Sequence, residues 1–181
     1  MITAAELRKI CPYAKAKADL LAPLLNAAML EFGIDNPLRE AAFIAQVAHE
    51  SGEFRYVREL ASGAEYDVGA KAIQLGNTPE DDDDGERYKG RGFIQVTGTD
   101  NYRDCGLVLG LDLLGDPTLL EQPALACRSA GWFWKSRGLN ELADKEDFLR
   151  ITKKINGGTT HYKERVAYYE RAKEVFSAEI A

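Results

Sequence analysis

The chain has 181 residues, of which 45% are hydrophobic, so it can bury a substantial core within one domain. Its formal net charge of -6 argues against nucleic-acid binding driven by overall charge. No run approaches the roughly 20 apolar residues of a membrane-spanning helix, and the N-terminus lacks the pattern of a signal peptide. The three cysteines have no metal-ligand spacing, so we expect buried thiols in a reducing compartment.

Three helices are predicted in the first part of the chain. Thr3 and Glu6 form a capping box that opens the first helix. An apolar-rich stretch at about 15–32 predicts the second. The third is predicted at 37–50, after a cap and a first-turn proline, and stops at Gly52. Apolar residues surround most of this third helix, so we expect it to be central and buried.

The rest of the chain is also predicted to be mainly helical. Further helices are expected at about 123–138, 145–155 and 160–178. The best strand candidate is 93–97, and the segment 62–88 has the weakest signal for regular structure. No linker or internal repeat divides the chain. The sequence therefore predicts a mainly α protein with a single domain.

Glu50 is the first candidate for chemistry. It ends an otherwise apolar helix, where burial and the negative end of the helix dipole both disfavour the carboxylate. Both effects favour a protonated carboxylic acid, which is what a general acid for glycosidic cleavage requires. His49 beside it is either a structural hydrogen-bonding residue or part of a site.

A second carboxylate is needed to activate water or to stabilise the reacting sugar. The candidates that follow the helix are Glu53, Glu59 and Glu65. Because Gly52 breaks the helix, helical spacing does not choose among them.

The segment 90–98 contains three glycines, which allow close approach of backbone or ligand. Alternation along the predicted strand separates two faces, with Ile94 and Val96 in the core and Phe93, Gln95 and Thr97 on the other side. An amide next to a hydroxyl suits the binding of sugar N-acetyl and hydroxyl groups, or the positioning of a water. The other interpretation is a tight turn with a hydrogen-bonded core glutamine.

No metal site is predicted. The acidic run 80–84 does not form an EF-hand, because the twelfth loop position would be Arg91 instead of a bidentate glutamate. Two histidines without an H-E-x-x-H motif exclude a typical zinc hydrolase site. We expect the acidic run to be a solvated loop.

Three blocks of sequence then occur in a recognisable order. They are His49-Glu50-Ser51-Gly52, Tyr88-Lys89-Gly90-Arg91-Gly92-Phe93-Ile94-Gln95-Val96-Thr97-Gly98 continuing to Asn101-Tyr102, and Ile155-Asn156-Gly157-Gly158. From about Leu20 to Tyr169 the chain resembles glycoside hydrolase family 19. Within that chitinase-like family, it is most similar to phage endolysins and related lytic enzymes.

The resemblance implies a lysozyme-like, two-lobed helical fold with a small β-hairpin element beside the cleft. It implies one catalytic domain over 1–181 and no separate cell-wall-binding module. Glu50 becomes the general acid, Glu59 the base that activates water, and Thr97 a residue that positions this water. The substrate-binding residues that it implies are His49, Tyr88, Gln95, Asn101 and Asn156.

The function that we expect is hydrolysis of β-1,4 bonds in bacterial peptidoglycan, with inversion and without cofactors, leading to host cell lysis. The resemblance further implies a monomer that acts on glycan strands, does not insert stably into membranes, and needs a holin to leave the host cytoplasm. A chitinase would use the same residues on chitin. A lytic transglycosylase would need Glu50 alone, and a non-catalytic glycan-binding protein would need neither carboxylate.

Overall fold

The computed structural model describes residues 1–177, and its regular structure is helical, as the sequence predicts. The chain divides into two compact units, which are described separately. Unit 1 combines Met1–Arg55 with the chain from Trp134 onward, and unit 2 is Tyr56–Phe133. Among the described residues, no helix is long and apolar enough to span a membrane.

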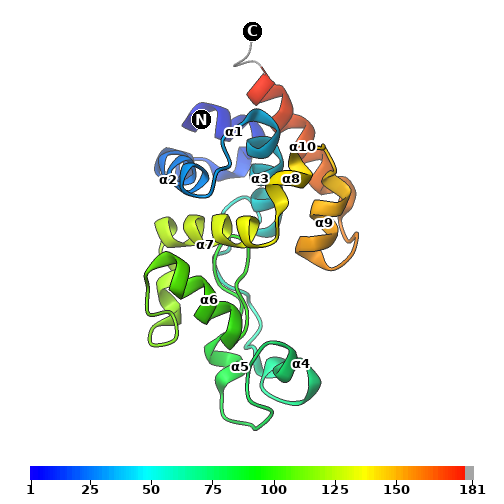
Figure 1. The fold of residues 1–181 in the computed structure, drawn as a ribbon. Coiled ribbons are helices and arrows are strands. Elements are labelled where there is room, and N and C mark those ends of the chain that lie inside the picture. Colours follow the sequence, from blue (N-terminus) through cyan, green and yellow to red (C-terminus); the bar gives the residue numbers. More distant parts are fainter. Residues whose placement is uncertain (178–181) are drawn as a thin grey trace. The chain divides into compact units, whose positions relative to one another are not determined.

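Unit 1 is a bundle of helices around α3 (Figure 1). Its elements are α1 (Ala4–Ile10), η1 (Pro12–Ala14), α2 (Lys17–Glu31), α3 (Pro37–Glu50), α8 (Leu139–Ala143), α9 (Phe148–Asn156) and α10 (Tyr162–Ser177). The long helix α7 (Pro123–Ser136) begins in unit 2 and ends in unit 1. The predicted last helix extended to residue 178, which lies outside the described residues.

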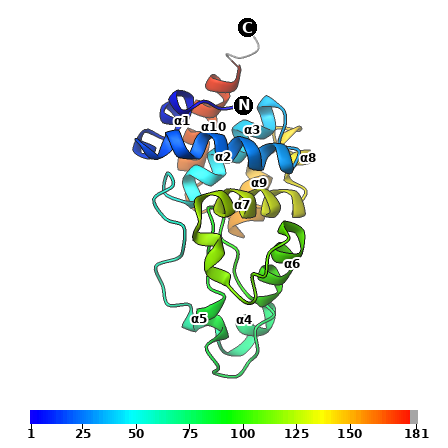
Figure 2. The same cartoon turned by 90° about the vertical axis from the view of Figure 1, so that its left-hand side faces the viewer.

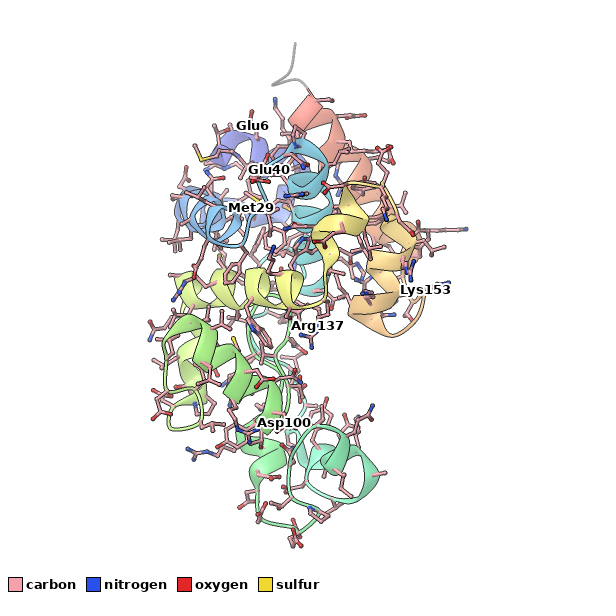
Figure 3. The ribbon with its side chains drawn as sticks, viewed as in Figure 1. Glu6, Met29, Glu40, Asp100, Arg137 and Lys153 are labelled. Carbon is pink, nitrogen blue, oxygen red and sulfur yellow. The ribbon has the colours of Figure 1, made fainter. Side chains whose placement is uncertain are left out.

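Helix α3 is the buried centre of unit 1, which confirms the sequence prediction. Asn36 caps it by accepting a hydrogen bond from the Arg39 N–H (3.0 Å), and Pro37 occupies the first turn. Every residue from 40 to 48 is buried. Glu40, labelled in Figure 3, lies 3.4 Å from the amino terminus of the chain, so this buried carboxylate has a cationic partner.

Unit 2 consists of shorter helices joined by long loops (Figure 2). Its elements are η2 (Ala64–Tyr66), α4 (Gly69–Gln74), α5 (Asp84–Arg87), α6 (Thr99–Leu109), η3 (Pro117–Glu121) and the first part of α7. The helix α6 was not predicted, because its asparagine, aspartates and glycine are weak helix formers. It packs through Tyr102, Cys105 and Leu109, all of which are buried.

The strand predicted at 93–97 is wrong. Residues 92–95 form a turn, closed by a single antiparallel bridge between Arg91 and Val96. Their backbones exchange hydrogen bonds of 3.1 and 2.8 Å. Phe93 is buried together with Ile94, because a turn does not alternate its side chains as a strand does. The β-hairpin element is therefore limited to this bridge, and Arg91 forms a second isolated antiparallel bridge with Arg58.

The predicted buried thiols are confirmed, since all three cysteines are free and buried. Burial raises the pKa of Cys105 and of Cys127 to about 12 in each case.

Asn140 of α8 forms hydrogen bonds to two other segments of unit 1. These bonds predict how its replacement affects stability. Its Oδ1 accepts from Trp134 Nε1 (2.8 Å), and its Nδ2 donates to the carbonyl of Gly33 (3.0 Å). Asn140→Ala leaves the buried indole N–H without a partner, so we expect a loss of about 1–3 kcal/mol in the free energy of unfolding. Denaturant unfolding measures this loss. The exposed neighbour Glu141→Ala should change it by less than about 0.5 kcal/mol, and equal effects would contradict the prediction.

Candidate active site

Glu50 is the last residue of α3, and the chain leaves the helix directly after it. Gly52 and Phe54 have positive φ angles of 57° and 66°. The Ser51 hydroxyl accepts a hydrogen bond from the Phe54 N–H (2.8 Å), which holds this turn in place. The Glu50 side chain thereby lies at the edge of the core and is 24% exposed.

Arg165 of α10 is the charged partner of Glu50. The Arg165 side chain is only 2% exposed, and its Nη1 lies 2.5 Å from Oε1 of Glu50. The same nitrogen donates to Oε1 of Gln46 (2.6 Å), whose Nε2 donates to Thr152 of α9 (2.8 Å). Because Oε1 of Glu50 makes no aligned hydrogen bond, its contact with Arg165 is an ion pair. This network connects α3, α9 and α10 and holds the Glu50 carboxyl in place.

Sequence reasoning missed the role of Arg165. The signal was nevertheless present in the spacing. Arg165, Tyr169, Ala172 and Phe176 follow at intervals that place them on one helix face, and all four are buried.

His49 and Asn156 also belong to unit 1. The half-buried His49 ring lies 5.6 Å from the ring of His161, centroid to centroid. Burial lowers the pKa of His49, and the positive charge of Arg165 lowers it further. Asn156 is the exposed last residue of α9, and Gly157 caps that helix with a φ of 73°.

Glu59 lies in unit 2 against Gly90 and Gln95. Its backbone N–H donates to the carbonyl of Gly90 (2.9 Å), and its Oε2 accepts from the Tyr66 hydroxyl (3.1 Å). A Cβ atom at Gly90 would lie 2.9 Å from Oε2 of Glu59 and 2.6 Å from Oε1 of Gln95, so the glycine allows both side chains to approach. The other oxygen of Glu59, Oε1, is buried and has no hydrogen-bond partner.

The two competing carboxylates have different surroundings. Glu53 is buried, and its oxygens accept hydrogen bonds from the Tyr13 N–H (2.6 Å) and the Tyr168 hydroxyl (2.7 Å). Glu65 is exposed and pairs with Lys71 at 3.1 Å. Only Glu59 of these three combines a buried, unbonded oxygen with a held side chain. It is therefore the best candidate for a base among the residues that the sequence left open.

The turn at 90–98 presents two of the predicted site residues. Its buried residues Ile94 and Val96 anchor it, while Gln95 and Thr97 are half-buried. Asn101, in the first turn of α6, donates from Nδ2 to the carbonyl of Thr97 (2.8 Å). Asn101 thus holds the backbone at Thr97.

A buried arginine fixes the start of this turn. Arg91 is 7% exposed and donates to Glu121 Oε1 (2.9 Å) and to the Tyr102 hydroxyl (3.0 Å), which in turn donates to the Lys89 carbonyl (2.6 Å). The predicted binding residue Tyr88 uses its hydroxyl to donate to the Leu114 carbonyl (3.1 Å).

The acidic run is largely the exposed loop that the sequence predicts, but its end is connected to the fold. Oxygen atoms of Asp67, Asp82 and Asp84 lie within 4.8 Å of one another. Thr78 donates from its N–H to Asp84 (2.7 Å) and from its hydroxyl to Asp82 (2.9 Å), and the Gly85 N–H donates to Asp67 (2.9 Å). These hydrogen bonds close the loop onto α5.

The predicted site residues are divided between the two units. Unit 1 holds His49, Glu50 and Asn156, whereas unit 2 holds Glu59, Tyr88, Gln95, Thr97 and Asn101. Within unit 2, the structure brings Glu59 together with Gln95, and Asn101 together with Thr97.

The lowered pKa of His49 predicts how the stability of the folded protein depends on pH. The folded state disfavours the charged imidazole, so the unfolded chain binds a proton more readily than the folded protein. The stability contribution is present above the ordinary pKa of 6.5 and is lost as the pH falls through the lower folded value. As the pH falls from about 7.5 to 5, we expect the unfolding free energy of His49→Gln to decrease less than that of the wild type. Parallel stability curves of the two proteins would contradict this.

Comparison with known proteins identifies the family. The family model described as chitinase class I, of glycoside hydrolase family 19, matches residues 35–142. A glycosyl hydrolase family 19 domain-containing protein of Haemophilus influenzae is 31% identical over 93% of this chain and 94% of its own length. An Arabidopsis thaliana endochitinase is 39% identical over 72% of this chain, which spans only 43% of that relative.

Solved structures share the fold. A bacterial family 19 chitinase superimposes with a TM-score of 0.78, covering 97% of this chain and 94% of its own, at 23% identity. Chitinase C from Streptomyces griseus gives a TM-score of 0.76, covering 97% of this chain and 76% of its own, also at 23% identity. The family model and the Haemophilus relative together show that this chain belongs to glycoside hydrolase family 19 and is a chitinase-like glycoside hydrolase.

Proposed function

We propose that this enzyme is an endolysin that hydrolyses the β-1,4 bonds of peptidoglycan, with Glu50 as general acid and Glu59 as general base. The observation that carries this proposal is the contrast between the two carboxyl groups. Glu50 is paired with a buried arginine, whereas Glu59 is held through one oxygen and has its other oxygen unbonded. Inverting glycosidases use two carboxyl groups, one that protonates the leaving oxygen and one that activates water. The family resemblance gives these roles to Glu50 and Glu59.

In this mechanism, Glu50 gives a proton to the glycosidic oxygen as the bond to the leaving sugar breaks. The carboxylate that results lies next to Arg165, whose positive charge stabilises it. Gln46 holds the guanidinium through its own amide, so the arginine does not need to move during the step.

Glu59 takes a proton from the water that attacks the anomeric carbon. Its buried Oε1 is the atom without a hydrogen-bond partner and is therefore the acceptor that we assign to this water. Thr97 positions the water, and Gln95, next to Glu59 at Gly90, binds the sugar. Attack by water on the face opposite to the leaving oxygen inverts the anomeric carbon.

One feature supports peptidoglycan as the substrate. The three cysteines of this chain are free, so among residues 1–177 it lacks the disulfide framework typical of secreted enzymes. The likeness to named chitinases makes chitin hydrolysis the second candidate. A lytic transglycosylase would have no use for the held carboxylate of Glu59.

The cellular role follows from this proposal. The enzyme acts as a monomer on glycan strands without a cofactor. It accumulates in the host cytoplasm and reaches the cell wall after a holin opens the inner membrane.

Glu50→Gln tests the general acid. The amide cannot donate a proton to the leaving oxygen, so we expect kcat of the folded variant to fall by about 10²–10⁴-fold. Its unfolding free energy should also fall, because Arg165 loses its anionic partner. Glu59→Gln should lower kcat to a similar or smaller degree. Release of reducing ends from purified peptidoglycan measures both, with Glu141→Gln, an exposed glutamate of α8, as the control. Lysis by Glu50→Gln at the wild-type rate would rule out its assignment.

The products identify the substrate and the reaction. Mass spectrometry of peptidoglycan digests should find soluble muropeptides with normal reducing sugars. Anhydro-muramic ends would instead show transglycosylation. Cleavage of N-acetylchitooligosaccharides without cleavage of peptidoglycan would favour the chitinase.

Gly90→Ala tests whether close packing holds the base. The added Cβ would meet Gln95 at 2.6 Å and Glu59 at 2.9 Å, so both side chains must shift. A small displacement of a reacting group is costly, and we expect kcat to fall about tenfold or more with an unchanged circular dichroism spectrum. A folded variant with full activity would show that this packing is not needed.

A further inference from the structure

Glu59 has a side-chain donor that the sequence analysis did not consider. The hydroxyl of Tyr66, in η2, donates to Oε2 of Glu59 at 3.1 Å. The second oxygen, Oε1, is buried without a partner. A carboxylate fixed through one oxygen keeps the other in a defined direction, which is what a base for water requires.

The backbone of Tyr66 is itself held. Its carbonyl accepts from Nδ2 of the buried Asn77 (2.9 Å), and its N–H donates to the carbonyl of Gly63 (2.8 Å). Gly63 has a φ of 93°, and a Cβ there would lie 2.6 Å from the carbonyl oxygen of Gly85. The loop that carries Tyr66 is therefore closed too tightly to accept a larger residue at Gly63.

Lys71 of α4 holds the phenol ring from one side. Its Nζ lies 4.5 Å from the centroid of the Tyr66 ring and 3.1 Å from Oε2 of Glu65. The Tyr66 hydroxyl donates to Glu59, while Glu65 is paired with Lys71. Burial raises the pKa of Tyr66, and the charge of Glu59 raises it further, so the hydroxyl stays protonated as a donor.

A second tyrosine–glutamate pair, Tyr168 with Glu53, differs from the Tyr66–Glu59 pair in how its carboxylate oxygens are bonded. Tyr168 donates to Glu53 at 2.7 Å in unit 1, but the other oxygen of Glu53 accepts from the Tyr13 N–H (2.6 Å). That pair satisfies both oxygens and serves the fold alone. The Tyr66–Glu59 pair leaves one buried oxygen unsatisfied, which costs stability and indicates a use in function.

We propose that Tyr66 is a positioning residue for the base Glu59, and that Lys71 holds the ring of Tyr66 in place for this task. The proposal rests on the proposed function, because it assigns to Tyr66 an action through Glu59 alone. Tyr66 has no reacting atom of its own.

Tyr66→Phe tests the proposal and keeps the ring for Lys71. We expect kcat to fall about tenfold with KM within twofold of wild type, because the hydroxyl acts on the base and not on the substrate. Tyr168→Phe is the matched control: it removes the same kind of hydrogen bond, and kcat should remain unchanged although the melting temperature falls. A wild-type kcat in Tyr66→Phe would overturn the proposal.

A double-mutant cycle with Glu59→Asp separates positioning from a general structural effect. The shorter side chain withdraws the carboxylate from Tyr66, so Tyr66→Phe should cost less than about twofold in that background. The same tenfold loss in both backgrounds would overturn the proposal. Lys71→Met provides a second test if Tyr66→Phe does not fold. Its kcat should fall about two- to fivefold at unchanged KM. An unaffected kcat would show that Lys71 does not hold Tyr66 in place and would contradict the proposal.

Failure of the proposed function gives a different result. If Glu50→Gln and Glu59→Gln hydrolyse glycan strands as the wild type does, the catalytic assignment is wrong. If both are inactive and Tyr66→Phe is fully active, only the positioning role is wrong.

Discussion

The buried guanidinium of Arg165 is the constraint on which unit 1 depends. An arginine side chain that is 2% exposed must be neutralised and hydrogen-bonded, because an unpaired buried charge is very costly. Gln46 and Glu50 of α3 meet this need, and Gln46 also contacts Thr152 of α9. One charge thereby sets the register of three helices and fixes the carboxyl group at the end of α3. Fold stability and the placement of the proposed acid have the same physical origin.

Unit 2 also contains a buried arginine, which stabilises a short turn. Arg91 is buried and ties the turn to Glu121 and Tyr102, while Gly90 leaves space for Glu59 and Gln95. Each unit thus contains one proposed catalytic carboxylate and one buried arginine that helps to place it. In unit 1 the arginine contacts the carboxylate itself, and in unit 2 it holds the backbone that the carboxylate packs against.

The elements that the sequence predicted well are those with strong local signals. The capping box at Thr3 is present, and the cap and proline before α3 start that helix. The helix α6 escaped prediction because tertiary packing of Tyr102, Cys105 and Leu109 outweighs weak local propensity. The strand at 93–97 was wrong because a short apolar run fits a buried turn as well as a strand.

By itself, the sequence determined the mainly helical fold, the buried α3 and the family, since periodicity, caps and motif order are local or linear properties. Spacing left Glu53, Glu59 and Glu65 open as the second carboxylate, and the family resemblance assigned Glu50 and Glu59. The tertiary structure gave these carboxylates different surroundings, because the partners of Glu53, such as Tyr168, are distant in the chain. The pairing of Arg165 with Glu50 and of Tyr66 with Glu59 was likewise decided in three dimensions. The physical reason is that the state of a carboxyl group depends on which charges and donors surround it, and folding alone brings these together.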